Sequence, residues 1–255
     1  MGLTRFKLVL EYDGKDFVGW QLQPGQRSVQ SEVEAALEKL CGHPIRVHAA
    51  GRTDSGVHAL DQCAHFDTSA ERTPRDVLRG LNGSLPADVA VVSASVAPEG
   101  FDARQWSWGK VYRYRFLGRS ARSPIRRHRV WNLRTALDAE AMNAGAQHWL
   151  GEHDLSSFRA RLCMAATPVR KIKQIGVNAV GDEVHLEVHG IGFLRHMVRI
   201  MAGTLADIGR GKRPPEWAGQ VLEARSRQAA GKTAPAHGLE LRQTLYGDGP
   251  PPWKR

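Results

Sequence analysis

One carboxylate in this sequence, Asp54, stands where a side chain could do chemistry, in the stretch Gly51-Arg52-Thr53-Asp54-Ser55-Gly56. The runs on either side, 44–49 and 62–66, have the composition of strands, so we expect Asp54 on a tight turn between them. Such a turn can hold a functional group rigidly at a cleft. A carboxylate held there can attack an electrophilic carbon or stabilise a cationic one, as in glycoside hydrolysis. Turn chemistry alone also explains the Asp and Gly residues, because both favour turns.

A second segment carries basic and aromatic side chains together. Lys and Arg number 36 against 26 Asp and Glu, so the formal net charge is +10. Aromatic residues alternate with arginines between positions 112 and 131: Tyr112, Arg113, Tyr114, Arg115, Arg119, Arg122, Arg126, Arg127, Arg129 and Trp131. Basic groups bind phosphates and aromatic rings stack on unpaired bases, so this pattern is typical of proteins that hold splayed or single-stranded RNA.

The stretch Gly51-Arg52-Thr53-Asp54-Ser55-Gly56-Val57-His58-Ala59 resembles the catalytic motif of the tRNA pseudouridine synthase A family. Other segments resemble that family in the same order along the chain: 10–14, 19–23, 28–30, 101–104, 112–115, 156–159 and 193–199. Together they span residues 5–246, which makes the resemblance specific. One segment departs from the family pattern, because Gln105-Trp106-Ser107-Trp108 stands where an aromatic and a small residue are expected.

The resemblance implies that the protein isomerises uridine to pseudouridine in tRNA and that Asp54 is the nucleophile. Attack of Asp54 on C1′, stabilisation of positive charge at C1′ and addition to C6 of the uracil all remain open. The resemblance assigns Arg199 as the cation that keeps Asp54 ionised, and Tyr112 as the residue that stacks on the uracil and handles the C5 proton. Tyr114 lies on the same face of a regular strand, so the residues alone do not separate the two tyrosines.

We expect the RNA to contact basic and aromatic side chains along the chain. Arg52 would contact the RNA backbone or fill the place of the flipped base. The other expected contacts are Arg104, Lys110, Tyr112, Arg113, Arg126, Arg127, Arg195 and His196.

The chemistry predicts no cofactor and no metal, because the isomerisation is redox-neutral. His48, His58 and His65 lack the close spacing of metal ligands. Gly190-Ile191-Gly192 lacks the third glycine of a dinucleotide-binding motif.

The surrounding elements read as an α+β protein. In the first half, residues 5–12 alternate like a half-buried strand, Ser28 begins a helix that runs to Leu40, Thr73-Pro74 begins a second helix, and 89–96 form a strand. This order suggests a split α+β unit of ferredoxin-like type. In the second half we expect strands at 111–117, 169–180, 183–189 and 239–246, and helices that begin at 135–138 and at 194.

We therefore predict an N-terminal α+β domain over 1–105, a C-terminal α+β domain over 106–246 and a loose tail over 247–255. The first domain would carry the Asp54 turn and the second Tyr112 and Arg199. The resemblance implies two ferredoxin-like-type halves with mainly antiparallel sheets that meet at a central active-site cleft.

The resemblance further implies positions 38–40 of the tRNA anticodon stem-loop as targets, and a homodimer. No apolar run approaches the ~20 residues of a membrane span, and the scattered Cys41, Cys63 and Cys163 read as buried thiols of a reducing cytoplasm. A catalytically idle RNA-binding module or tRNA-folding chaperone, and a paralogue acting on another RNA, are the alternatives. A simple binder would not need Asp54, Tyr112 and Arg199 together.

Overall fold

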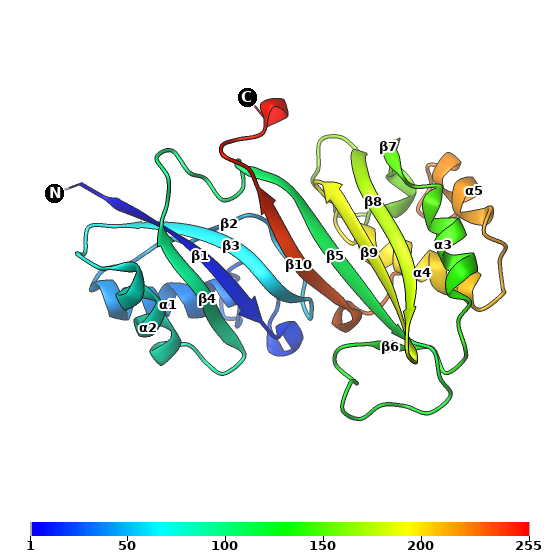
Figure 1. Cartoon of the computed structure of the whole chain (residues 1–255), viewed down its shortest axis with the longest axis horizontal. Coiled ribbons are helices and arrows are strands. Elements are labelled where there is room, and N and C mark those ends of the chain that lie inside the picture. The colour runs from blue at the N-terminus through cyan, green and yellow to red at the C-terminus, as the bar shows by residue number, and fades with distance from the viewer. Residues whose placement is uncertain (1, 255) are drawn as a thin grey trace. The chain divides into compact units, whose positions relative to one another are not determined.

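The computed structural model describes residues 2–254, which form two compact units (Figure 1). The chain passes from unit 1 to unit 2 after Trp108 and returns to unit 1 after Glu240. Both units combine helices with a mainly antiparallel sheet, so the predicted α+β class is confirmed.

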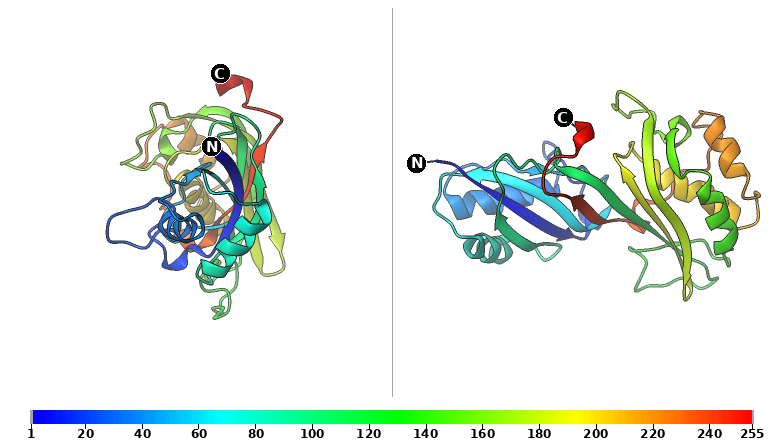
Figure 2. Two further views of the ribbon diagram at one scale, coloured as in Figure 1. Left: turned by 90° about the vertical axis from the view of Figure 1, so that its left-hand side faces the viewer. Right: turned by 45° about the horizontal axis from the view of Figure 1, so that its top comes forward.

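Unit 1 is built on four neighbouring strands. Their order in the sheet is β4-β1-β3-β10, with bounds Val89–Val96, Thr4–Tyr12, His58–Thr68 and Leu239–Tyr246. The central strand β1 pairs antiparallel with both β3 and β4, and the short β2 (His48–Ala49) pairs with β3. Helices α1 (Val29–Cys41) and α2 (Pro74–Ser84) lie together on one face of this sheet (Figure 2).

Local sequence explains where these elements begin and end. Side chains Phe6, Leu8 and Leu10 of β1 are fully buried, as strand alternation requires. The Ser28 side chain accepts a hydrogen bond from the N–H of Ser31 and caps α1. Gly42 ends that helix with a φ of 77°, a left-handed conformation that suits glycine.

Unit 2 carries a sheet in the order β5-β9-β8-β7, with all pairs antiparallel. The bounds are Ser107–Leu117, Glu183–Ile191, Val169–Val180 and Gly151–Asp154. A short strand β6 (Trp131–Asn132) runs parallel to the end of β5. Helices α3 (Ala139–Gln147), α4 (Met197–Gly209) and α5 (Trp217–Glu223) lie to one side of this sheet (Figure 1).

The prediction of a strand over 44–49 is wrong except at the end of that range, since only His48 and Ala49 pair with β3. The N–H of Val47 donates instead to the Glu34 carboxylate at 3.0 Å, which takes this backbone out of the sheet. Strand β3 is longer than expected because its pairing with β1 extends from Thr68 to Ala59, with a register shift between Leu10 and Tyr12.

The helix expected from residue 194 begins only at Met197. His196 adopts a φ of 61°, in the left-handed region, and so cannot continue a helix in the N-terminal direction. Strand β7 and helix α5 were not predicted, because neither is long enough to give a periodic pattern.

The C-terminal segment packs differently from the expected loose tail. Residues 241–254 group with unit 1, and Trp108 donates from Nε1 to the carbonyl of Gly249 at 2.8 Å. The Trp108 and Trp253 rings meet edge to face at 5.3 Å, and Lys254 donates to the carbonyl of Arg104 at 2.7 Å. The departure from the family pattern at 105–108 therefore supplies the aromatic ring that holds the tail.

Within residues 2–254, no helix combines the length and apolar character needed to cross a bilayer.

Candidate active site

Asp54 lies on the turn between β2 and β3, and its side chain is half-buried. The N–H of Val57 donates to the Asp54 carbonyl at 3.1 Å and closes the turn. Asp54 also forms an isolated antiparallel bridge with Gly19, and the N–H of Trp20 donates to the carbonyl of Thr53 at 3.1 Å. The turn is thus fastened to the loop that follows β1.

Glycine at position 19 makes this close approach possible. Its φ is +118°, and a Cβ there would lie 2.6 Å from the Thr53 carbonyl oxygen. The start of α1 fixes the same loop from its other side: Val29 donates to the carbonyl of Gly19 at 3.2 Å, and Gln30 to that of Trp20 at 3.0 Å. The resembling segments 19–23 and 28–30 therefore form the support of the Asp54 turn.

Buried hydrogen bonds brace the turn from the sheet. The hydroxyl groups of Tyr12 and Thr53 lie 2.8 Å apart, and Gln62 donates from Nε2 to the Gly51 carbonyl at 2.8 Å. Burial raises the pKa of Tyr12 to about 12, so its hydroxyl remains protonated at neutral pH. The residues on both sides of Arg52 are held while the Arg52 side chain itself is exposed.

The histidines near the turn have structural partners. His58 is buried, and its Nδ1 accepts a hydrogen bond from the N–H of Gly14 at 3.1 Å. His65 accepts one from the N–H of Ala103 at 3.1 Å and stacks on His48 with ring centroids 5.1 Å apart. Over residues 2–254, no three His, Cys, Asp or Glu side chains are grouped so as to hold a metal ion.

Tyr112 and Tyr114 point to the same face of β5, and their environments separate them. Tyr114 is fully buried, and its hydroxyl donates to the carbonyl of Pro235 at 2.8 Å. Burial raises the pKa of Tyr114 well above its ordinary value. Tyr112 retains 8% exposure and meets the Phe193 ring edge to face at 4.8 Å. Tyr114 is therefore closed into the core, whereas Tyr112 keeps a small exposed edge.

Arg199 lies in the first turn of α4 and is half-buried. Its Nε donates to the carbonyl of Ala234 at 2.9 Å, and the N–H of Ala234 donates back to the Arg199 carbonyl at 3.0 Å. The neighbouring Pro235 accepts the Tyr114 hydroxyl. One short segment, 234–235, therefore fixes both the Arg199 guanidinium and the Tyr114 hydroxyl. Asp54 and Arg52 belong to unit 1, whereas Tyr112 and Arg199 belong to unit 2.

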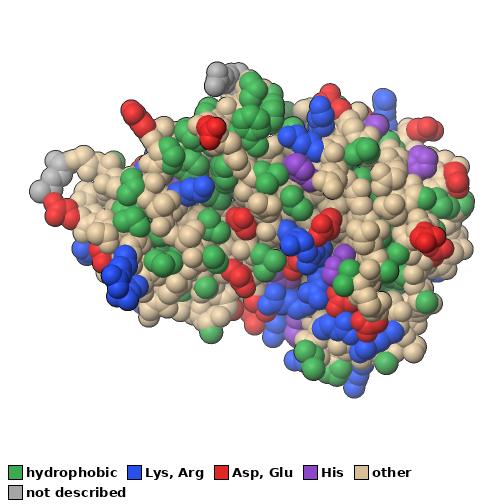
Figure 3. All heavy atoms as spheres, viewed as in Figure 1, with side chains coloured by type: hydrophobic (Ala, Val, Ile, Leu, Met, Phe, Trp, Pro, Cys, Tyr) green, Lys and Arg blue, Asp and Glu red, His purple; other side chains and the backbone are tan. Residues whose placement is uncertain are grey.

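Two of the arginines expected to contact RNA are engaged with carboxylates. Arg113 lies 2.9 Å from Glu187 and 3.4 Å from Glu240, and Arg126 lies 2.7 Å from Asp182 and 2.8 Å from Glu183. Basic and acidic atoms accordingly intermingle over the lower part of unit 2 in Figure 3. The other expected contacts are either exposed (Arg104, Arg127 and Arg195) or half-buried (Lys110 and His196).

Comparisons with known proteins identify the family. A family model described as tRNA pseudouridine synthase matches residues 8–104 and 146–246. The chain belongs to the tRNA pseudouridine synthase family. It is 49% identical over 250 residues to a tRNA pseudouridine synthase A of Myxococcus xanthus, covering 98% of this chain and 94% of that relative. A tRNA pseudouridine synthase A of Geotalea uraniireducens is 44% identical over 244 residues, covering 96% of this chain and all of that relative.

These findings confirm the resemblance drawn from the motifs. Enzymes of this family are isomerases that convert uridine to pseudouridine in tRNA. The matched ranges contain Asp54, Arg104, Arg195 and Arg199, whereas the segment 105–145 lies outside them. That segment carries β5, Tyr112 and the loop over residues 118–130, called here the arginine-rich loop.

Proposed function

We propose that this protein isomerises uridine to pseudouridine in the anticodon stem-loop of tRNA, with Asp54 as its nucleophile. The observation that carries this proposal is the bracing of Asp54, whose turn is fixed by Gly19, Gln62 and Tyr12 in a chain that belongs to the family. A carboxylate that must meet one carbon of a bound nucleotide needs such rigid support.

The reaction needs one bond broken and one formed at the same ribose carbon. The N1–C1′ bond breaks, the uracil turns, C5 bonds to C1′, the proton on C5 leaves, and N1 gains a proton, so the product is an isomer of the substrate. Asp54 can attack C1′, stabilise positive charge there or add to C6 of the base, and each route returns the carboxylate unchanged. The ring of Tyr112 offers a stacking face for the flipped base, and its hydroxyl is the group assigned to the C5 proton. Arg199 is the cation assigned to keep Asp54 ionised.

Release of tritium from C5 tests this function. Purified protein is mixed with tRNA, or with a short anticodon stem-loop, that carries uridine tritiated at C5, and released tritium is counted with a chelator present. We expect turnover by the native protein without added cofactor. Binding of the RNA without tritium release would favour the binding-module alternative, and release from another RNA but not from tRNA would favour the paralogue alternative.

Replacing Asp54 by Asn tests the nucleophile. The amide keeps the size and most of the hydrogen bonding of the carboxylate, so we expect tritium release to fall at least about 1,000-fold. The affinity for tRNA and the thermal midpoint should remain those of the native protein. Substantial turnover by this variant would contradict the assignment, and failure to fold would make Asp54 a structural turn residue.

The proposal also includes a homodimer, as the resemblance implies, and a cytoplasmic location. Cys41, Cys63 and Cys163 form no disulfide among residues 2–254, which supports a reducing compartment. Sedimentation of the purified protein with and without tRNA would measure the number of chains in the complex.

A further inference from the structure

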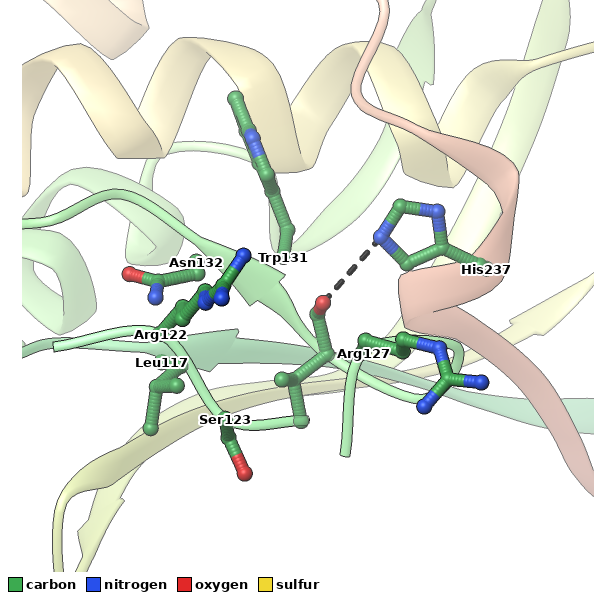
Figure 4. A pocket seen from close by; sticks show the side chains of 8 residues that line it. Leu117, Arg122, Ser123, Arg127, Trp131, Asn132 and His237 are labelled. Atoms are coloured by element: carbon green, nitrogen blue, oxygen red, sulfur yellow. Dashed lines mark hydrogen bonds between the residues drawn. The ribbon is translucent and has the colours of Figure 1, made fainter. Parts of the chain in front are cut away.

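Figure 4 shows a pocket of about 220 Å³ beneath the arginine-rich loop of unit 2. Its apolar wall is closed, because Leu117, Val130 and Trp131 are 0%, 2% and 9% exposed. The Trp131 ring packs on Tyr114 and Phe116, with ring centroids 6.3 Å and 6.0 Å away. This pocket therefore belongs to the packing of unit 2, whereas unit 1 presents an exposed arginine on a fixed segment.

That arginine, Arg104, is exposed at the end of a segment that packs beside the Asp54 turn. The buried side chains Phe101 and Ala103 belong to one apolar cluster with Ala50. Ala50 directly precedes the motif that carries Asp54. Arg104 therefore emerges in unit 1 next to the start of the turn that carries the nucleophile.

Hydrogen bonds hold the backbone around Arg104. The N–H of Arg104 donates to Oδ1 of Asp102 at 2.8 Å, and the hydroxyl of Tyr246 donates to the Ala103 carbonyl at 2.6 Å. The N–H of Ala103 donates to Nδ1 of His65 at 3.1 Å. In contrast, the Arg104 guanidinium forms no hydrogen bond or ion pair within the part of the chain that the structure describes. The protein thus fixes the backbone of Arg104 and leaves its charge unpaired.

The C-terminal tail, defined as residues 247–254, adds a further bond at this place. Lys254 donates from Nζ to the Arg104 carbonyl at 2.7 Å. Trp108 fastens the tail by its Nε1 hydrogen bond and by the edge-to-face contact with the Trp253 ring. The backbone of Arg104 is therefore held by the tail as well as by the sheet.

The tail lies outside the range that the family model matches, which ends at residue 246. It is nevertheless seated on unit 1, because Pro251 is buried and a Cβ on Gly247 would lie 2.8 Å from the Trp108 ring. Trp108 itself belongs to the segment that departs from the family pattern. The tail and this departure thus occur together, and both act on the backbone that follows Ala103.

Such fixing favours a contact between Arg104 and a phosphate. A guanidinium suits phosphate oxygens through paired hydrogen bonds. Binding that must order a mobile segment loses conformational entropy, and a segment already ordered by the protein avoids that loss.

We propose that the C-terminal tail is a positioning element for substrate binding. Trp253 and Lys254 hold the segment 101–104 so that the Arg104 guanidinium meets a phosphate of the RNA beside the uridine that reaches Asp54. The proposal rests on the proposed function, because it takes the ligand to be tRNA. Trp253 and Lys254 are positioning residues, and neither needs to touch the RNA.

Two tail variants test this role. Trp253→Ala removes the ring contact without a change of charge, and Lys254→Met keeps the aliphatic stem and loses the donor. We expect each to raise the Kd and the KM for tRNA by about three- to tenfold, with kcat within about twofold of the native value. Lys254→Arg keeps a donor and should restore native affinity. The matched control, Lys39→Met, removes one exposed charge from α1 and should leave affinity unchanged.

Combination with Arg104→Ala separates positioning from direct contact. Arg104→Ala alone should weaken binding about tenfold and lower the slope of log affinity against log salt by about 0.7–0.9, the effect of one phosphate. If the tail acts through Arg104, then Trp253→Ala or Lys254→Met added to Arg104→Ala should weaken binding no further.

Additive losses in these double variants would overturn the proposal, and so would native affinity in both single tail variants. Trp253 is 47% exposed, so we expect its replacement to leave unit 1 folded, and urea unfolding checks this. A variant that lost stability but kept native affinity would show a purely structural tail. The affinities need no turnover, so failure of the isomerase assay would be seen separately.

Discussion

At the scale of the residue, Tyr112 and Tyr114 show how environment assigns roles that residue type leaves open. Both face the same side of β5. The hydroxyl of Tyr114 donates a hydrogen bond to the Pro235 carbonyl in the core, whereas Tyr112 keeps some exposure beside Phe193. Alternation along a strand gives the shared face, but only the packing of the distant segment 234–238 shows which ring is covered.

The two tyrosines give a matched pair of variants. Tyr112→Phe keeps the stacking ring and loses the hydroxyl, so we expect tritium release to slow by about 100-fold or more with little change in stability. Tyr114→Phe leaves the buried Pro235 carbonyl without its donor and should cost about 1 kcal/mol of unfolding free energy, with modest loss of activity. Kinetics and urea unfolding of both variants check this. The reverse pattern would mean that Tyr114 handles the proton.

At the scale of the element, the Asp54 turn depends on a loop, a helix start and a strand that are distant in sequence. The motif and the glycines could be found in the sequence. The bridge from Gly19 and the brace from Gln62 could not, because each joins atoms from segments whose meeting depends on the sheet register.

Gly19→Ala tests this bracing. The added Cβ would meet the Thr53 carbonyl at 2.6 Å at a strained φ, so we expect a loss of about 2–4 kcal/mol of stability and a fall in turnover as the turn shifts. Gly25→Ala is the control: its φ is +71°, but no atom lies within 4 Å of the new Cβ. It should cost only about 1–2 kcal/mol through backbone strain and spare activity. Equal effects of the two substitutions would argue against the contact.

The arginine-rich loop should loosen in acid. The hydrogen bond from Arg126 lowers the pKa of Asp182 to about 2. Burial opposes ionisation of Glu183, but hydrogen bonds from Arg115, His185 and Arg126 outweigh it and lower its pKa to about 2. Both folded pKa values lie below the ordinary values of about 4, so the anchoring is complete above about pH 4.5 and is lost as the pH falls towards 2.

Hydrogen exchange of the amides in 118–130, corrected for the intrinsic effect of pH, measures this loosening. We expect protection to fall between about pH 4.5 and 2 in the native protein. Glu183→Gln should show part of that loss already at neutral pH. Protection that stays constant down to pH 2 in the native protein would show that the ion pairs do not hold the loop.

At the scale of the whole molecule, the number of basic residues overstates the cations that are available to RNA. Lys and Arg number 36, yet Arg113, Arg115, Arg119 and Arg126 are paired with carboxylates of unit 2. Composition and clustering of arginines therefore indicated RNA as the class of partner. The sequence could not show which arginines form ion pairs within the protein.

Salt dependence of tRNA binding measures the charges that remain. The exposed arginines that we assign to RNA are Arg52, Arg104, Arg127 and Arg195. If each neutralises one phosphate, the slope of log affinity against log salt should be about −2.8 to −3.6. Filter binding over a range of potassium chloride concentrations gives the slope, and Arg113→Gln serves as the comparison, since its loss removes an internal ion pair and should not reduce the slope. A slope near zero would mean that phosphate contacts do not drive binding, and a reduction by Arg113→Gln would mean that this arginine leaves its carboxylates to meet the RNA.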